Sequence, residues 1–234
     1  MKHLKHSPGL ILIVLFALTG LAACGGSASA PAATPTSTVA SVAGDFVGVT
    51  NNGDGITLST NGQQLLAYAC DGTATHAITF SVWFQGAVSH NAVNLTAANG
   101  SHLVATLTAQ AASGTVTLSS GHSFSFTAPA VNVTTGAGLY RGEETFAGVR
   151  YLGGWIILTE PAAISAPASG ALLSVVPQST PVTFIKPGAA GIINEQTGAL
   201  LAWPALTSQD IAARRVTVPN LGTFTMKQCR QAQC

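Results

Sequence analysis

The sequence predicts an all-β protein: an antiparallel up-and-down meander that closes into a barrel or sandwich, with one short helix near the C-terminus. Beyond Asp45, apolar and polar residues alternate with a period of two, as in Val93–Thr96 and Leu103–Thr108, which is typical of half-buried strands. Turn residues such as Asn61-Gly62 and Asn99-Gly100 interrupt these runs at spacings of about ten residues, the rhythm of a barrel or sandwich.

The meander is expected within residues 45–160, the core of a single β domain that spans residues 45–234. Alternation places Phe80 and Phe84 on one face of their strand and Trp83 on the other. A closed sheet is favoured because the strands carry no lysine with which an open edge would resist pairing with another sheet. The strands predicted here are Leu65–Cys70, Ile78–Phe84, Val93–Thr96, Leu103–Thr108, Thr115–Ser119, Ser123–Thr127, Ala137–Glu143 and Val149–Glu160.

Residues 161–234 are expected to hold a proline-rich crossing loop, then the C-terminal strands and the helix. Asn194–Gly198 has the composition of a hairpin turn. The helix begins at a cap formed by Thr207 or Ser208, with Asp210 in its first turn. It is predicted at Ser208–Arg214, and short strands are predicted near Leu172–Val176, Val182–Ile185, Gly191–Ile193, Ala199–Trp203, Arg215–Val218 and Gly222–Met226.

Charged residues are scarce, and their scarcity excludes several classes of protein. They make up 7% of the chain, against roughly 25% in a typical soluble domain. No Asp, Glu, Lys or Arg occurs between Gly72 and Tyr140. A nucleic-acid-binding protein is excluded because no cluster of Lys and Arg is present to displace phosphate counterions. A coiled coil with charged flanking positions and a disordered chain rich in charge are excluded as well.

The N-terminus has the pattern of a secretory signal. Lys2 and Lys5 precede an apolar run over Gly9–Ala23, which is shorter than the roughly 20 residues of a spanning helix. The run ends in Leu21-Ala22-Ala23-Cys24, which resembles the lipobox of bacterial prolipoproteins. The resemblance implies a signal peptide over residues 1–23, a lipid on the Cys24 thiol, and a mature protein anchored on the extracytoplasmic side of the cell membrane. The alternative is an ordinary secretory signal with an incidental cysteine.

Residues 24–44 are expected to form a flexible, lipid-anchored linker. From Gly25 to Gly44 the chain has no charge, no aromatic residue and no side chain larger than valine, so it cannot bury enough apolar surface to offset its chain entropy. Four motifs of the folded part, AYACDG, GTVTL, GLYRGE and GGWIIL, are similar to those of uncharacterised secreted β proteins of soil bacteria. That resemblance supports a β fold and implies no particular activity.

With Cys24 assigned to lipid, three cysteines remain outside the cytoplasm, where disulfides persist. An odd number allows at most one bridge within the chain. The favoured pairing joins Cys70 to Cys229 or Cys234, because closing a loop of about 160 residues would contribute roughly 4–5 kcal/mol. The alternatives are a local Cys229–Cys234 bridge and no bridge. A metal site at the cysteines is not expected, since no CxxC pair is present.

The densest charged cluster of the mature chain is Tyr140–Glu144. Glu143 and Glu144 are neighbours on a predicted strand and point to opposite faces, so they cannot act together on one glycosidic bond. If this strand pairs with the next, Arg150 can meet either glutamate in a register-setting ion pair. Tyr140, Arg141 and Glu143 are also candidates for recognition of a ligand.

Trp83 is the other binding candidate, since an exposed tryptophan on a polar sheet can stack on a sugar or a partner surface. The alternative is that the crossing loop or the C-terminal segment covers it. Asp71 has the sequence context of a turn residue. His76, His102 and His122 fall at one end of the meander, where a metal could bind only if strong curvature brought them together.

No motif for a nucleophile elbow, a zinc protease, a phosphate loop or a dinucleotide is present, and no cofactor is expected. The leading hypothesis is a lipid-anchored domain with a non-catalytic binding or structural role, whose partner is a glycan or an envelope protein. A second hypothesis is a lipocalin-like barrel for a small apolar ligand, which requires a cavity among Phe80, Phe84, Phe124 and Phe126. A third is an envelope hydrolase that uses Asp71, Glu143 or Glu144.

Overall fold

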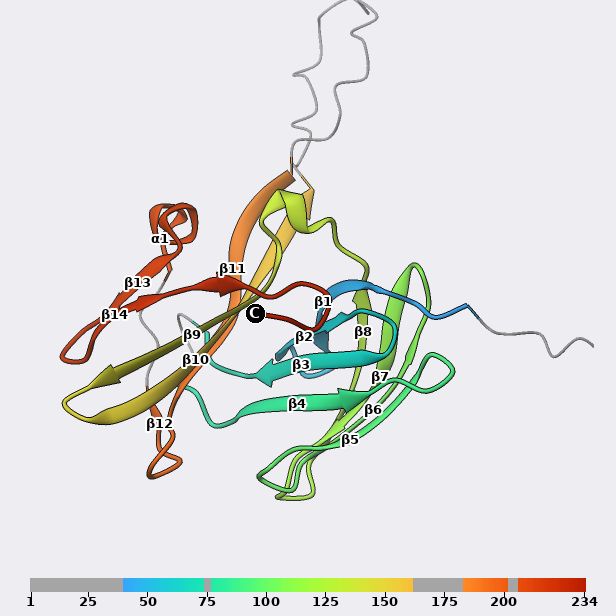
Figure 1. Ribbon diagram of the computed structural model, residues 1–234, viewed down its shortest axis with the longest axis horizontal. Helices are drawn as coiled ribbons and strands as arrows, with labels where there is room; N and C mark the ends of the chain where they lie inside the picture. Colours follow the sequence, from blue (N-terminus) through green and yellow to red (C-terminus); the bar gives the residue numbers. More distant parts are fainter. Residues whose placement is uncertain (1–39, 74–76, 162–182, 202–205) are drawn as a thin grey trace, which may run out of the picture. The chain divides into compact units, whose positions relative to one another are not determined.

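The computed structural model describes residues 40–73, 77–161, 183–201 and 206–234, which belong to one compact unit from Thr38 to Cys234 (Figure 1). Most of this part is β-strand, as the sequence predicts. The first eight strands are β1 Gly44–Thr50, β2 Gly55–Thr60, β3 Gln64–Cys70, β4 Ser81–Ala87, β5 Ala92–Thr96, β6 His102–Leu107, β7 Ala111–Thr117 and β8 Ser123–Pro129; a 3-10 turn, η1, follows at Val133–Thr135.

These eight strands form a nearly closed antiparallel barrel. Their order is β4-β3-β2-β1-β8-β7-β6-β5, so two meanders of four strands are joined by the pairing of β1 with β8. The barrel remains open between β4 and β5, although a tight turn connects them in the chain. The predicted up-and-down barrel is therefore confirmed. Its gap lies between two strands in the middle of the barrel sequence, β4 and β5, whereas the first and last strands, β1 and β8, pair with each other.

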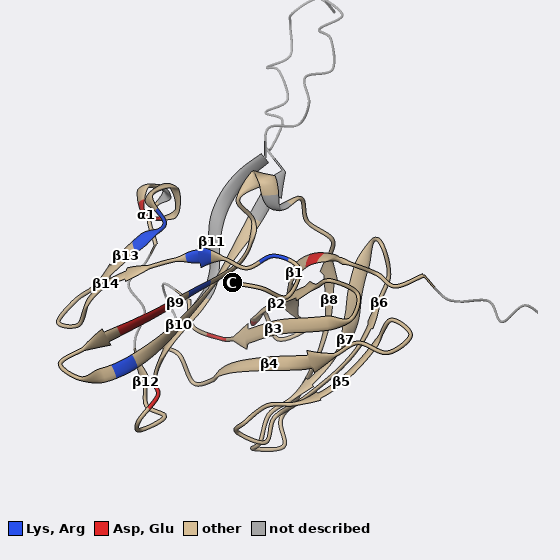
Figure 2. Cartoon of the chain, in the orientation of Figure 1, with Lys and Arg blue, Asp and Glu red and all other residues tan. Residues whose placement is uncertain are grey.

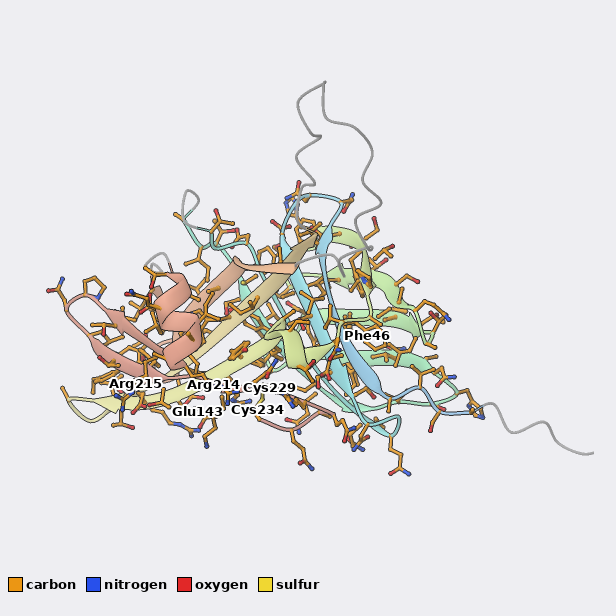
Figure 3. The ribbon with its side chains drawn as sticks, turned by 90° about the horizontal axis from the view of Figure 1, so that it is seen from above. Phe46, Glu143, Arg214, Arg215, Cys229 and Cys234 are labelled. Carbon is orange, nitrogen blue, oxygen red and sulfur yellow. A yellow bond between two sulfur atoms is a disulfide. The ribbon has the colours of Figure 1, made fainter. Side chains whose placement is uncertain are left out.

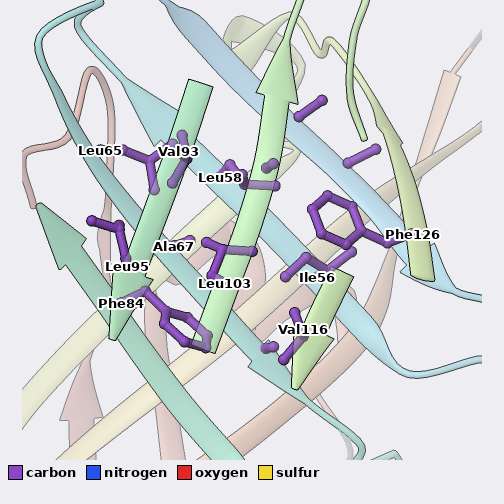
Figure 4. Close-up of a cluster of buried hydrophobic side chains, with 14 of the residues drawn as sticks. Ile56, Leu58, Leu65, Ala67, Phe84, Val93, Leu95, Leu103, Val116 and Phe126 are labelled. Atoms are coloured by element: carbon purple, nitrogen blue, oxygen red, sulfur yellow. The ribbon is translucent and has the colours of Figure 1, made fainter. Parts of the chain in front are cut away.

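The interior of the barrel is filled by apolar side chains. Every second residue of each strand points inward, and together these residues form one buried hydrophobic cluster (Figure 4). Phe84 from β4 and Phe126 from β8 are 0% and 5% exposed, so neither lines an open cavity. Inward side chains from both meanders meet here, namely Ile56, Leu58, Leu65, Ala67, Val93, Leu95, Leu103 and Val116.

The turns of the barrel lie at two ends, because consecutive antiparallel strands reverse direction. Ala40–Ala43 enters at the end that carries the β4–β5 turn, where the amide of Val42 donates to Asn91 Oδ1 at 2.8 Å. Asn91 Nδ2 in turn donates to the carbonyl of Ala40 at 2.9 Å. We call this the entry end. The far end carries the β1–β2, β3–β4, β5–β6 and β7–β8 connections.

Charge is distributed unequally over the fold. Residues 44–129, which form the barrel, include no Lys or Arg and three aspartates, all of them buried: Asp45, Asp54 and Asp71. Figure 2 shows the basic segments, in blue, on β9, β10 and the C-terminal elements, whereas acidic segments, in red, lie both there and beside β1 and β3. The outward positions of β5–β8 are instead occupied mostly by Thr, Ser and Asn, which keep the surface polar without charge.

A second sheet has the order β12-β11-β10-β9-β15. The sequence places the strands up to residue 160 in one meander, and this is wrong, because the barrel ends at Pro129 and the next two strands pair with β11 and β15 instead. The predicted strand near Leu172–Val176 lies outside the described residues. The five strands are β9 Gly138–Phe146, β10 Val149–Pro161, β11 Thr183–Asn194, β12 Leu200–Leu201 and β15 Lys227–Gln228.

Strand β11 runs without interruption through two segments that the sequence predicts as separate strands. Its register against β10 shifts between Ile156, opposite Ala189, and Ile157, opposite Pro187, which leaves Gly188 as an extra residue. A β-bulge of this kind lets a strand continue past a proline that cannot donate to the ladder. The predicted turn at Asn194–Gly198 is present at the end of β11, where the amide of Gly198 donates to the carbonyl of Asn194.

Tyr68 packs between the barrel and the second sheet. It projects outward from β3, is fully buried, and belongs to a cluster with Leu139 and Ile156 of the second sheet. A Cβ at Gly154 would lie 2.5 Å from the Tyr68 ring, so the ring fits only because β10 carries glycine there. The Tyr68 hydroxyl lies 2.9 Å from Ser81 Oγ and donates to the carbonyl of Gly191 at 3.4 Å.

The opposite face of the second sheet is covered by the helix α1 (Ser208–Ala213) and the hairpin of β13 (Arg215–Val218) and β14 (Gly222–Thr225). The helix begins as predicted: the Thr207 side chain accepts from the amide of Asp210 at 3.1 Å, and Asp210 Oδ2 accepts from the amide of Thr207 at 2.8 Å. Among the described residues, no helix has the length and apolar character needed to cross a bilayer.

Candidate functional site

The candidate residues of strand β9 alternate between its two faces. Arg141 and Glu143 lie on the side on which Leu139 packs against the barrel, whereas Tyr140 and Glu144 lie on the opposite side. Tyr140 is 3% exposed, and its hydroxyl donates at 2.8 Å to a backbone carbonyl four residues earlier. Tyr140 is therefore part of the core under the hairpin, and the residues on β9 that reach the surface are Arg141, Glu143 and Glu144.

Glu143 is held between two arginines. Arg141 Nε donates to Glu143 Oε1 at 2.7 Å, and Arg150 from β10 pairs with Oε2. Arg150 also pairs with Glu195 at 2.9 Å, so the ion pair predicted across this hairpin extends into a ladder of four charges. The hydrogen bond from Arg150, aided by Arg141, lowers the pKa of Glu143 below its usual value of 4.5. Glu143 therefore stays ionised near neutral pH.

Trp83 is packed in the contact between the barrel and β9. The guanidinium of Arg141 lies over its ring at 5.0 Å from the centroid, and the ring of Tyr68 lies 4.5 Å away at a 38° tilt. Ala232 and Cys229 of the C-terminal segment belong to the same cluster. Trp83 thus holds Arg141 in place by a cation–π contact, and its ring is not a free surface for stacking.

A pocket of about 560 Å³ lies beside this contact, in the crease between the outer face of the barrel and the edge of the second sheet. We call it the crease pocket. In Figure 3, Glu143 lies near the Cys229–Cys234 disulfide, and Cys234 also lines the pocket. The lining residues come from β3, β4, β9, β14, β15 and the C-terminal segment: Leu66, Gln85, Arg141, Glu143, Glu144, Thr225, Lys227, Ala232 and Cys234.

Lys227 gives the crease pocket its electrostatic character. It is paired directly with Arg141 across the β15–β9 ladder, so two cationic side chains stand side by side on one face. Arg141 is compensated by Glu143, whereas Lys227 forms no ion pair within the described part of the chain. Glu144 lines the same pocket, and its carboxylate accepts one long hydrogen bond, at 3.4 Å from the amide of Thr225.

Asp71 lies elsewhere, at the far end of the barrel. Its Oδ1 accepts from the amides of Thr79 and Phe80 at 2.8 and 3.1 Å, so the side chain ties the end of β3 to the residues that precede β4. The structure therefore brings Glu143 and Glu144 to one pocket and Asp71 to another. His102 and His122 lie at the far end too, His76 lies outside the described residues, and the described residues contain no group of three or more metal-binding side chains.

The disulfide joins Cys229 to Cys234, and Cys70 is a free, buried thiol. The favoured prediction of a bridge from Cys70 to the C-terminal segment is therefore wrong. Four residues separate the two bonded cysteines, and the outer two of these, Arg230 and Gln233, exchange backbone hydrogen bonds of 2.7 and 3.0 Å across a two-residue turn. This hairpin brings their Cα atoms to 4.0 Å, whereas the thiol of Cys70 is enclosed under the second sheet. The bridge borders the crease pocket.

Two aromatic residues that the sequence suggests only as core or cavity lining reach a second pocket. Phe80 packs against the barrel core at the far end, Phe124 stacks on Phe80, and both are partly exposed. Their alternation with polar residues is the same as that of the buried Phe84 and Phe126, so the sequence gives no signal to tell the two pairs apart.

No protein-family model matches the chain, and the searches of curated proteins and of solved structures found no significant match.

Proposed function

We propose that the protein is a lipid-anchored, non-catalytic binding domain of the cell envelope, and that the crease pocket holds a zwitterionic, peptide-like ligand. The anchor rests on the lipobox at Cys24 and on the linker up to Gly44. The binding role rests on one observation above all. Lys227 stands beside Arg141 in the crease pocket, and among the described residues Lys227 forms no ion pair with an acidic side chain.

The charges in the crease pocket match the two ends of a peptide. A ligand carboxylate beside Lys227 and Arg141 would offset the repulsion of these two cations. A ligand ammonium would suit Glu144, whose carboxylate has only one long hydrogen bond within the described residues. Arg141 is fixed by Glu143 and by the Trp83 ring, so part of the site is ordered before a ligand arrives.

The other two hypotheses receive less support. A lipocalin-like site needs a hollow interior, and Phe84 and Phe126 instead fill the barrel as part of its core. A hydrolase needs a carboxyl group that can give or take a proton near neutral pH. Two guanidinium groups hold Glu143 ionised, and Asp71 lines a different pocket. Glu144 borders the same pocket as Glu143 but projects from the other face of β9.

The ligand proposal is tested by titrating the full-length protein with trialanine, with N-acetyl-trialanine and with trialanine amide in a calorimeter. Free trialanine should bind most tightly, and each blocked end should weaken binding. Lys227→Gln should weaken it about ten-fold, the effect of losing roughly one charge-assisted hydrogen bond. The matched control is Arg215→Gln, which removes an exposed cation on β13 that lies across the hairpin from Thr225 but does not itself line the pocket. Equal affinities for the free and blocked peptides, or equal losses in the two variants, would overturn the proposal.

The anchor is tested separately by growing cells with an alkyne-labelled palmitate. The wild-type protein should carry the label and fractionate with membranes, and Cys24→Ser should lose both properties, because multiple acyl chains are what make such an anchor stable. An unlabelled wild-type protein, or a Cys24→Ser variant that still carries the label, would contradict lipid attachment at Cys24.

A further inference from the structure

We propose that the far end of the barrel carries a second site, which binds a neutral sugar. A pocket of about 570 Å³ lies there, in the size range of small-molecule sites. We call it the barrel-mouth pocket. It shares no lining residue with the crease pocket and lies at the end of the barrel opposite the point where Ala40–Ala43 enters. The residues that carry the argument are Asn52, Asp54, Asp71, Thr79, Phe80 and Phe124.

One wall of the pocket is aromatic. The rings of Phe80 and Phe124 lie nearly parallel, at an interplanar angle of 13° with centroids 5.7 Å apart. Both side chains are partly exposed, whereas the deeper Phe84 and Phe126 are buried. An aromatic wall that remains partly open to solvent can pack against the apolar C–H face of a pyranose ring.

The polar walls are fixed in place by hydrogen bonds within the barrel. Asp71 holds the backbone of Thr79 and Phe80 and so sets the position of the Phe80 ring. The amide of Asn51 donates to the carbonyl of Ser125 at 2.8 Å, and Asn51 Oδ1 accepts from the amide of Ser125 at 3.0 Å, which ties the β1–β2 turn to the strand of Phe124. A site already held in one arrangement loses little entropy when it binds.

Asp54 supplies an acceptor for a sugar hydroxyl. Its Oδ2 accepts from Thr50 Oγ1 at 3.2 Å and from Asn52 Nδ2 at 3.4 Å. Within the described part of the chain, no hydrogen bond goes to its Oδ1, and Asp54 lines the pocket. A carboxylate oxygen beside an aromatic wall accepts hydrogen bonds from a hydroxyl donor and rejects an anion.

Charge decides the class of ligand. The whole barrel has no Lys or Arg, so an anionic ligand would meet two carboxylates here, and His122 is the one basic side chain among the described lining residues. A neutral ligand with several hydroxyl groups meets an aromatic wall, the carboxylate acceptor of Asp54 and the hydroxyl oxygen of Thr79, which donates to Asp71 Oδ2 at 2.5 Å and can still accept a hydrogen bond. A second hollow of about 340 Å³ shares Thr79, Phe80 and two β7–β8 residues with this pocket, so the site continues past Phe80 and suits an oligosaccharide.

The test is a binding screen of the full-length protein against immobilised maltotriose, mannotriose, xylotriose and laminaritriose, with trigalacturonic acid as the acidic comparison. At least one neutral trisaccharide should bind and the acidic one should not. Phe124→Leu, which keeps the apolar volume and removes the aromatic face, should weaken binding about ten-fold. Asp54→Asn should weaken it several-fold and serves as a second variant at a different wall of the site.

Phe146→Leu is the matched control, because Phe146 is a partly buried phenylalanine on the second sheet. It should leave sugar binding unchanged, as should Lys227→Gln in the crease pocket, so the two proposed sites can fail independently. The proposal would be overturned if no neutral trisaccharide bound, if trigalacturonic acid bound as tightly, or if Phe146→Leu cost as much affinity as Phe124→Leu.

Discussion

Asp45 lies at the start of β1 with 9% of its surface exposed, and its Oδ1 has no hydrogen-bond partner among the described residues. Burial raises its pKa above the usual 3.8, although hydrogen bonds from Ser59 and Gln231 act in the opposite direction. Because the pKa is higher in the folded chain than in the unfolded one, ionisation of Asp45 opposes folding. Its unfavourable effect is absent at low pH and develops as the pH rises through the folded pKa.

We therefore expect Asp45→Asn to gain stability relative to the wild type as the pH rises from about 3 to about 7. The measurement is the free energy of urea unfolding of both proteins at several pH values. The opposite pH dependence is expected for Glu143→Gln, since the pKa of Glu143 is lowered and its contribution is lost as the pH falls. A difference between wild type and Asp45→Asn that did not change with pH would contradict the assignment.

Cys70 shows how burial controls a thiol. It is 0% exposed, and desolvation raises its pKa from 9.0 to about 12. Because the thiolate is the reactive form, Cys70 should not react with a thiol reagent such as Ellman's reagent in the native protein near pH 8. In a chain with Cys24→Ser, one thiol should react after unfolding without reductant. Rapid reaction of the native protein would show that Cys70 is accessible.

At the level of elements, the contact of β3 with β10 depends on glycine. We expect Gly154→Ala to destabilise the fold by roughly 1–3 kcal/mol, because its Cβ would overlap the Tyr68 ring. The matched control is Gly44→Ala, where the nearest atom would be the Phe46 ring at 3.5 Å, an ordinary contact. The free energy of unfolding of both variants is measured in urea. Equal losses of stability would mean that the fit of the Tyr68 ring over Gly154 makes no specific contribution to stability.

The β9–β10 hairpin contains a residue poorly suited to its conformation. Ala147 and Gly148 form the two-residue turn with φ angles of 50° and 80°, a geometry that favours Asn-Gly. We expect Ala147→Asn to stabilise the protein by about 0.5–1 kcal/mol, since asparagine tolerates positive φ better than alanine. Ala98→Asn, at an exposed turn residue without positive φ, should have little effect on the melting temperature.

At the scale of the whole molecule, the local pattern of apolar and polar residues predicts the strands and the helix. It does not predict which strands pair when they lie far apart in the sequence. Alternation predicts strands such as β6 and β8 to within a few residues, because each buries one face. Nothing local shows that β1 pairs with β8 or that Lys227–Gln228 returns to β9. The barrel depends on the first of these pairings and the second sheet on the other. Alternation alone therefore extends the predicted meander to residue 160, past the end of the barrel at Pro129.

The candidate site divides in the same way. Arg141 and Glu143 stand out in the sequence because charge is rare, and the structure places both at a pocket. Lys227 joins them only through its pairing across the β15–β9 ladder, and Phe124 becomes a pocket residue only because β8 begins at the far end of the barrel. Both depend on topology, which the residues of a single segment do not encode.

The disulfide has a modest role in the stability of the whole fold. A loop of about six residues loses little chain entropy when it is closed, so breaking the Cys229–Cys234 bridge should cost about 2 kcal/mol, well below the cost of a long bridge. Cys234→Ser should show this loss in urea unfolding and should also weaken trialanine binding, because Cys234 lines the crease pocket. Peptide mapping that linked Cys70 to Cys229 would contradict the pairing.

The barrel has no Lys or Arg, whereas the second sheet carries cationic side chains, and this separation gives the two proposed sites different responses to ionic strength. Attraction between exposed charges is screened over roughly 8 Å in physiological salt and over less at higher salt. Raising sodium chloride from about 50 to about 500 mM should therefore weaken a ligand at Lys227 and Arg141 and leave a sugar at Phe80 and Phe124 unaffected. At the location proposed for the protein, outside the cytoplasm, the salt concentration varies. The affinity of the crease pocket would then change with the surroundings, and the affinity of the barrel-mouth pocket would stay constant.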